Sequence, residues 1–159
     1  MFVLKVYHPN EFSSERDKWE FDWVSSIEHI STNDSDSFVG TETILVADDD
    51  ALVRKMLTSF LTDYGYRVII AENGQEAVEK YKNHSDNIHL VLMDIVMPLK
   101  NGIEAHKEIL ALDKEATLVL TTGYRADKIK EIEGLPIIQK PFSPLEMIKV
   151  VRSALENHK

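Results

Sequence analysis

Hydrophobic and polar positions alternate along most of the chain in a repeated order of strand and helix. Short apolar runs bounded by turn residues predict buried strands, and apolar residues three and four positions apart predict helices. The predicted strands are 43–47, 67–71, 89–93, 116–121 and 136–139. The predicted helices cover 51–64, the positions around Ala77, Val78 and Tyr81, those around Ile103, His106, Ile109 and Leu110, and 125–132 and 144–155. This alternation predicts an α/β fold, with a parallel sheet covered by helices on both faces.

Residues 1–41 do not follow this alternation. We expect them to form an acidic N-terminal leader and linker, partly ordered at most, before a domain that covers 42–159. Both tryptophans, Trp19 and Trp23, lie in the leader, so we expect part of it to pack on the domain or on a second copy of the chain. The polar run 31–37 predicts the linker.

The composition excludes several classes of protein. The absence of cysteine excludes disulfides and thiolate metal sites. No apolar stretch is long enough to span a membrane, and the first residues lack the pattern of a signal peptide. The net charge of −9, without a basic stripe, argues against direct binding of nucleic acid. We therefore expect a soluble, cytoplasmic protein.

Candidate reactive residues follow four of the predicted strands. Asp48 and Asp49 follow the first strand and Asp94 follows the third, while the pair Thr121-Thr122 and Lys140 follow the fourth and fifth. The carboxyl ends of parallel strands meet at one edge of the sheet, where α/β proteins bind ligands. Three close carboxylates repel one another unless a cation joins them, and an all-oxygen ligand set favours Mg²⁺. Asp94 could then accept a phosphoryl group as an aspartyl phosphate.

Four motifs together resemble the receiver domain of two-component response regulators over residues 42–157. They are Val46-Ala47-Asp48-Asp49-Asp50, Met93 to Pro98 with Asn101-Gly102, Thr121 to Tyr124, and Gln139-Lys140-Pro141-Phe142. The resemblance implies a flavodoxin-like, three-layer fold with a five-stranded parallel sheet in the order 2-1-3-4-5. It also implies a signalling receiver, rather than an enzyme, that assists only its own phosphorylation and dephosphorylation.

The resemblance assigns the acidic residues to roles at one site. Asp94 matches the phosphoacceptor of the family. Asp48 and Asp49 match its acidic pair, which holds Mg²⁺ together with Asp94, and the backbone carbonyl of Val96 matches a further ligand of the ion. Asp50 is expected to cap the start of the first helix and not to act as a third ligand, because aspartate commonly occupies the cap position.

Lys140 matches the lysine that contacts the phosphoryl group, and the family usually has a cis bond before the proline that follows, here Pro141. The switch hydroxyl belongs to Thr121 or Thr122. We select Thr122, because Gly123 matches the small residue that normally comes next and Thr121 is then left to end the strand.

The chain departs from the family pattern in two ways. Ile137 replaces the aromatic residue that usually lies three positions before the lysine, so a signal would travel by a different packing, with the predicted 125–132 helix as a candidate. Val96 and Tyr124 lie two residues beyond Asp94 and Thr122, on the expected path of attacking water. Neither can orient that water as an acid or amide would, which suggests a long-lived aspartyl phosphate.

The expected partners are a sensor histidine kinase or a histidine phosphotransfer protein as donor, and an unknown downstream protein. Homodimer formation is left open. No output domain follows the last predicted helix, so we expect a single-domain regulator. The alternative is a receiver segment of a hybrid sensor histidine kinase, whose receivers have a lead-in similar to 40–46.

Proteins of other classes share parts of this pattern. A haloacid-dehalogenase-type phosphohydrolase would use the spacing of Asp48 and Asp50, but Leu52 stands where that family has Thr or Val. A flavodoxin-type module would need a phosphate-binding loop where this chain has three acids. A pseudo-receiver that is never phosphorylated would not need the full set of acids, hydroxyl and lysine.

Overall fold

The computed structural model describes residues 36–123 and 135–157 of the chain. Its elements, in order, are η1 (Asp36–Phe38), β1 (Thr43–Ala47), α3 (Ala51–Asp63), β2 (Arg67–Ala71), α4 (Gly74–His84), β3 (Leu90–Asp94), α5 (Gly102–Leu112), β4 (Leu118–Thr122), β5 (Ile137–Gln139) and α6 (Pro144–Glu156). The predicted helix 125–132 and the leader up to residue 35 lie outside the described residues. The third and fourth strands each end one residue later than predicted, so that Asp94 and Thr122 are the last residues of their strands.

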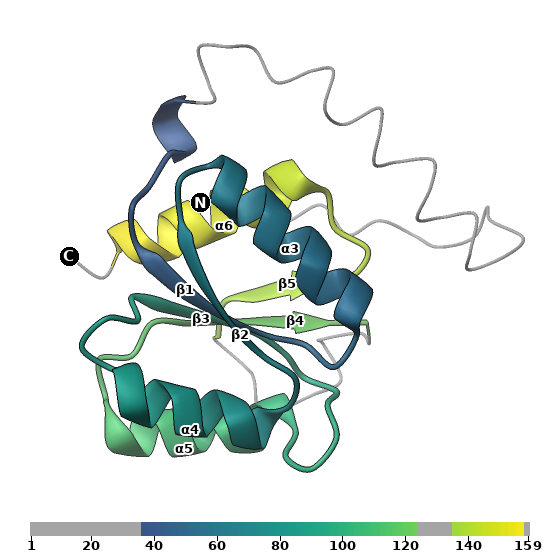
Figure 1. Ribbon diagram of the computed structural model, residues 1–159, viewed down its shortest axis with the longest axis vertical. Coiled ribbons are helices and arrows are strands. Elements are labelled where there is room, and N and C mark those ends of the chain that lie inside the picture. Colours follow the sequence, from purple (N-terminus) through teal and green to yellow (C-terminus); the bar gives the residue numbers. More distant parts are fainter. Residues whose placement is uncertain (1–35, 124–134, 158–159) are drawn as a thin grey trace, which may run out of the picture.

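The five strands form one parallel sheet in the order β2-β1-β3-β4-β5. Helices α4 and α5 lie side by side on one face of the sheet, and α3 and α6 cover the other face (Figure 1). This arrangement confirms the predicted flavodoxin-like, three-layer fold. It leaves the carboxyl ends of β1, β3 and β4 at the same edge, next to the residue that follows β5.

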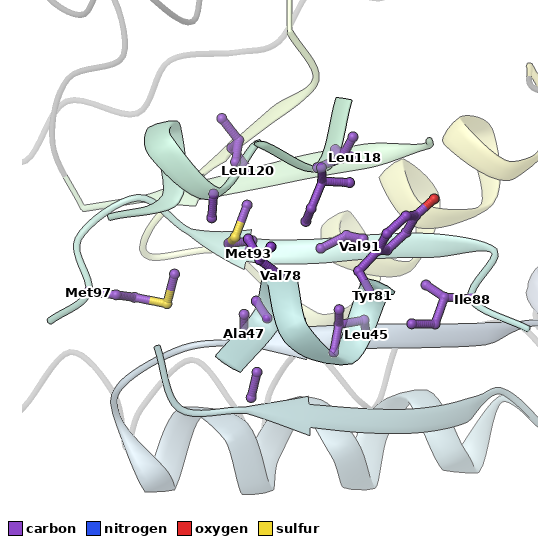
Figure 2. Packing of buried hydrophobic residues seen from close by; sticks show 14 of the residues in the cluster. Leu45, Ala47, Val78, Tyr81, Ile88, Val91, Met93, Met97, Leu118 and Leu120 are labelled. Carbon is purple, nitrogen blue, oxygen red and sulfur yellow. The ribbon is translucent and has the colours of Figure 1, made fainter. Parts of the chain in front are cut away.

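Alternate residues of the central strands enter two separate hydrophobic cores. Leu45 of β1 and Val91 of β3 pack with the helices α4 and α5, as the close view in Figure 2 shows beside Val78 and Tyr81. The intervening residues of the same strands pack against α3 and α6. A strand with both faces buried needs a continuous apolar sequence, which is why LVLM precedes Asp94 without a polar residue.

The helices begin at residues that satisfy their first backbone N–H groups. The Asp50 carboxylate accepts hydrogen bonds from the N–H groups of Leu52 and Val53 at the start of α3, which confirms its prediction as a cap. Asn101 forms a reciprocal capping box with Glu104 at the start of α5. Each helix start therefore fixes the loop that comes before it, on the edge of the sheet that carries the candidate residues.

The loop between β3 and α5 passes very close to the backbone of Asp94. A Cβ atom on Gly102 would lie 2.2 Å from the Asp94 carbonyl oxygen, so only glycine fits there. The Gly102 N–H donates to the carbonyl of Ile95 at 2.8 Å. Within the same loop, Leu99 has a φ of 66° and an exposed side chain, a backbone conformation that a branched residue rarely adopts.

Residues before β1 also contact the domain. The Tyr66 hydroxyl donates to the Phe38 carbonyl at 2.9 Å, and the Gly40 N–H donates to the Tyr64 carbonyl at 3.0 Å. The Phe38 side chain packs against the core beneath α3 and α6. The packed structure thus includes residues before position 42. In the part of the chain that the structure describes, no helix combines the length and apolar character needed to cross a membrane.

Candidate functional site

The ends of β1 and β3 place two buried carboxylates beside one ammonium group. Asp48 directly follows β1 and Asp94 is the last residue of β3; both are at least nine-tenths buried. The Lys140 Nζ lies 2.8 Å from Asp48 Oδ2 and 3.2 Å from Asp94 Oδ1. Lys140 comes directly after β5, and the bond between it and Pro141 is cis, as the sequence predicted. Three of the sequence-predicted residues therefore meet at one point.

The environment shifts the pKa values of Asp94 and Lys140. Burial, which disfavours the charged carboxylate, raises the pKa of Asp94; attraction to Lys140 opposes this shift and repulsion from Asp48 adds to it. Burial by itself would lower the pKa of Lys140. Its hydrogen bond and charge attraction to Asp48, with further attraction to Asp94, outweigh burial, so that the pKa of Lys140 is raised. The site therefore keeps a fixed cation beside a carboxylate that is costly to ionise.

The carboxylates of Asp48, Asp49 and Asp94 form a group that suits a divalent cation. One oxygen from each residue lies within 4.8 Å of those from the other two. Asp49 is exposed, whereas Asp48 and Asp94 are buried, so the group opens toward solvent on the side of Asp49. A set made only of carboxylate oxygens, with no histidine or cysteine, fits the ligand preference of Mg²⁺.

The hydroxyl that contacts Asp94 in this structure is that of Thr121, whereas the family resemblance selected Thr122 as the switch hydroxyl. Thr121 Oγ1 donates to Asp94 Oδ1 at 3.3 Å, and the two residues are direct partners in the ladder between β3 and β4. Adjacent residues of a strand point to opposite faces. Thr121 shares the face of Val119, which packs toward α3 and α6, while Thr122 shares the face of Leu118 and Leu120.

Two other predicted positions occupy the periphery of the site. The Val96 side chain is half exposed in the loop after β3. Ile137 opens β5 and packs against the core on the α4 and α5 side. Tyr124 lies outside the described residues. Counting two positions from Thr121 instead of Thr122 arrives at Gly123, where a Cβ atom would have none of the described residues within 4 Å.

Sequence reasoning missed one residue that holds this site together. Arg54 in α3 is buried and donates through Nη1 to the backbone carbonyls of Asp48 and Asp49, at 2.8 and 3.0 Å. Its Nη2 lies 2.7 Å from Glu72, which follows β2. The signal in the sequence was an arginine among the apolar positions of an amphipathic helix, six residues after Asp48.

The comparisons with known proteins agree with this geometry. A family model, "Response regulator receiver domain", matches residues 44–152. The chemotaxis protein CheY of Thermotoga maritima is 41% identical over 113 residues, which cover 68% of this chain and 92% of that protein. Response regulator RR06 of Streptococcus pneumoniae is 33% identical over 118 residues, or 72% of this chain, which spans only about half (54%) of that longer relative.

A solved structure gives the same result for the fold. The crystal structure of the CheX-CheY-BeF3-Mg+2 complex from Borrelia burgdorferi contains a chain that aligns with a TM-score of 0.66 and 34% sequence identity, over 70% of this chain and 87% of that one. The family match covers more than half of the sequence, and the acids, hydroxyl and lysine of its motifs meet at one edge of the sheet. This chain therefore belongs to the response regulator receiver domain family of two-component signalling.

Proposed function

We propose that this receiver accepts a phosphoryl group on Asp94 from the phosphohistidine of a sensor kinase or a histidine phosphotransfer protein. The observation that carries the proposal is the surroundings of Asp94. Its buried carboxylate has the Lys140 ammonium at 3.2 Å and the Thr121 hydroxyl at 3.3 Å, with two further acids next to it. This set offers a nucleophile and donors for the transferred oxygens within one site.

In the proposed transfer, a carboxylate oxygen of Asp94 forms a bond to phosphorus as the P–N bond of the donor breaks. The bonding electron pair leaves with the imidazole, which takes up a proton. Lys140 and Thr121 then donate hydrogen bonds to the oxygens of the transferred group, in place of those that they now make to the carboxylate. Negative charge accumulates on these oxygens during the transfer, and the two donors stabilise it.

The residues fit a bound Mg²⁺. Asp48, Asp49 and Asp94 would hold it, with the backbone carbonyl of Val96 as a further ligand, and the ion would supply charge neutralisation between the acids and the phosphoryl oxygens. The Borrelia complex named above contains Mg²⁺ and BeF3, which supports the same assignment for a relative at 34% identity. Lys140 also neutralises part of the charge of Asp48 and Asp94, whereas no ion pair within the described residues is made by Asp49.

Acetyl phosphate with Mg²⁺ tests this proposal directly. The native protein should gain the mass of one phosphoryl group with Mg²⁺ and should not gain it when a chelator is present from the start, while Asp94→Asn should gain nothing. Asp50→Asn is the matched control, because Asp50 serves only as the cap of α3 and asparagine caps equally well. Phosphorylation of Asp94→Asn to the native level would refute the assignment.

The cap role of Asp50 also argues against the phosphohydrolase alternative. That chemistry would need the carboxylates of both Asp48 and Asp50 to face the substrate. Instead the Asp50 carboxylate accepts from the α3 backbone, and the Asp50 N–H donates to Asp48 Oδ1 at 2.9 Å. We therefore propose a signalling receiver that covers residues 42–159, joined by contacts from Phe38 and Gly40, whether it acts alone or as a segment of a hybrid sensor kinase.

A further inference from the structure

A buried arginine, Arg54, donates hydrogen bonds to the backbone of the loop that carries Asp48 and Asp49. Arg54 lies one turn into α3, and one of its nitrogens, Nη1, bonds to two successive carbonyls, those of Asp48 and Asp49. A planar guanidinium has donors in fixed directions, so it restricts the orientation of the groups that it contacts. Because each peptide unit is planar, fixing a carbonyl also fixes the plane in which the next N–H lies.

The two acids depend on this support to different degrees. The Asp48 carboxylate has its own partners, since it accepts from the Asp50 N–H at 2.9 Å and from Lys140 at 2.8 Å. The Asp49 side chain is exposed at the mouth of the acidic group. Its direction is therefore set mainly by its backbone, which Arg54 holds.

The charge of Arg54 would repel a cation bound close by unless it were compensated. Glu72, which lies at the end of β2, pairs with Arg54 at 2.7 Å on the side away from the two carbonyls. The Glu72 N–H in turn donates to the Glu76 carboxylate at 2.7 Å, which anchors this turn at the start of α4. The arginine can thus act on the loop through hydrogen bonds while its charge is balanced locally.

We propose that Arg54 is a positioning residue that holds Asp48 and Asp49 in the geometry that binds Mg²⁺, with Glu72 as its counter-ion. This inference rests on the proposed function, because it concerns the same metal site. It adds a residue that contacts neither the metal nor the phosphoryl group but sets the affinity for the metal. Loss of such supporting contacts typically weakens metal binding about 10–100-fold.

Calorimetric titration of the full chain with MgCl₂ measures this affinity without any phosphoryl donor. Arg54→Met, which keeps the length of the side chain and removes its donors, should weaken Mg²⁺ binding about 10-fold or more. Arg54→Lys, which keeps the charge and can reach one carbonyl, should fall between native and Arg54→Met. Lys55→Met removes a cation from the next, exposed position of the same helix and should bind Mg²⁺ as the native protein does.

Phosphorylation by acetyl phosphate at increasing Mg²⁺ separates positioning from a general loss of structure. Arg54→Met should need a higher Mg²⁺ concentration for half-maximal rate and should reach the native rate at saturation. Where Arg54→Met does not fold, by circular dichroism, the same comparison is made with Arg54→Lys. A folded Arg54 variant with native Mg²⁺ affinity would overturn the inference, and so would a lower maximal rate at an unchanged Mg²⁺ midpoint.

The native protein distinguishes this inference from the proposal on which it rests. Native protein that binds Mg²⁺, together with Arg54 variants that bind equally well, would overturn only the role of Arg54. Native protein that neither binds Mg²⁺ nor accepts a phosphoryl group would overturn both.

Discussion

Thr121 donates its hydroxyl to the Asp94 carboxylate because the two residues are opposite each other in the ladder between β3 and β4. The contact is therefore fixed by strand register, not by loop conformation. Both side chains are buried, which shields the interaction from bulk water. A group added to this carboxylate oxygen would lie near both this hydroxyl and the Lys140 ammonium.

This relationship predicts that Thr121, and not Thr122, binds the modified carboxylate. Thr121→Val should weaken binding of beryllofluoride in the presence of Mg²⁺ about 10-fold or more, as expected from the loss of a hydrogen bond of about 1.5–3 kcal/mol to a charged group. Thr122→Val is the matched control and should stay within twofold of the native protein. Fluorine NMR titration measures both, and the reverse order of effects would restore the assignment of Thr122.

Asp94→Asn should stabilise the protein at neutral pH. The pKa of Asp94 is raised in the folded state, mainly by burial, so folding binds its proton more tightly than the unfolded chain does. This contribution favours folding below the ordinary aspartate pKa of about 3.9, and it is lost as pH rises through the higher folded-state value. Thermal unfolding without Mg²⁺ should thus give a higher midpoint for Asp94→Asn at pH 7, with a smaller difference toward pH 4.

An exposed aspartate provides the control for that measurement. Asp63→Asn, at the end of α3, should leave the unfolding midpoint nearly unchanged at both pH values. A midpoint of Asp94→Asn at or below that of the native protein at pH 7 would mean that attraction to Lys140 outweighs the burial of the carboxylate.

Gly102→Ala should destabilise the fold, although alanine normally favours a helix start over glycine. The added methyl group would meet the Asp94 carbonyl oxygen at 2.2 Å, so the backbone of β3 or of α5 must shift. Overpacking of this kind costs about 1–3 kcal/mol. Gly123→Ala, where the methyl group meets none of the described residues within 4 Å, should change the free energy of unfolding by less than about 0.5 kcal/mol, and urea titration measures both variants.

The residues before β1 should contribute to the stability of the domain. Phe38→Ala should lower the free energy of unfolding by about 1–3 kcal/mol, less than at a fully buried phenylalanine, because its side chain is only partly buried against the core. Val39 is 53% exposed, so Val39→Ala should cost less than about 0.5 kcal/mol. Equal effects of Phe38→Ala and Val39→Ala in chemical denaturation would support the predicted domain boundary at residue 42.

The aspartyl phosphate should be lost faster after Val96→Asn. Val96 is half exposed near Asp94 and has no polar group to orient a water molecule, and Gly123 has no side chain at all. An asparagine amide at position 96 would supply such a group. Decay of the phosphorylated mass in Mg²⁺ measures the rate, with Val96→Ala as the control for side-chain size; equal decay in native and Val96→Asn protein would contradict the role of this position.

The sequence predicted the fold well because two patterns in it are strong: the short apolar runs of the strands and the three-and-four spacing of apolar residues in the helices. The run from Leu90 to Met93 favours a strand buried on both faces, which the structure has, and β1 and β2 have the predicted bounds. The edge that collects Asp48, Asp94 and Lys140 then follows from the parallel order of the strands. These residues needed no side-chain geometry to be found.

Two details of the site could not be read from the sequence, for a common physical reason. Choosing between Thr121 and Thr122 requires the register of β4 against β3, and a strand that is apolar on both faces carries no alternation from which register can be read. Arg54 was missed because it donates to backbone carbonyls, and every residue has one, so the sequence does not show which carbonyls an arginine contacts. The position of its side chain becomes visible only when α3 lies against the end of β1.

The separation of Lys140 and Asp48 along the chain has a consequence for how signalling competence arises. Their ion pair joins positions 92 residues apart, and it connects the residue that follows β1 with the residue that follows β5. A nascent or partly unfolded chain that lacks β5 has the acids but not the amine. Under the proposed function, receipt of the signal is therefore restricted to molecules in which β5 has joined the sheet and brought Lys140 to the acids.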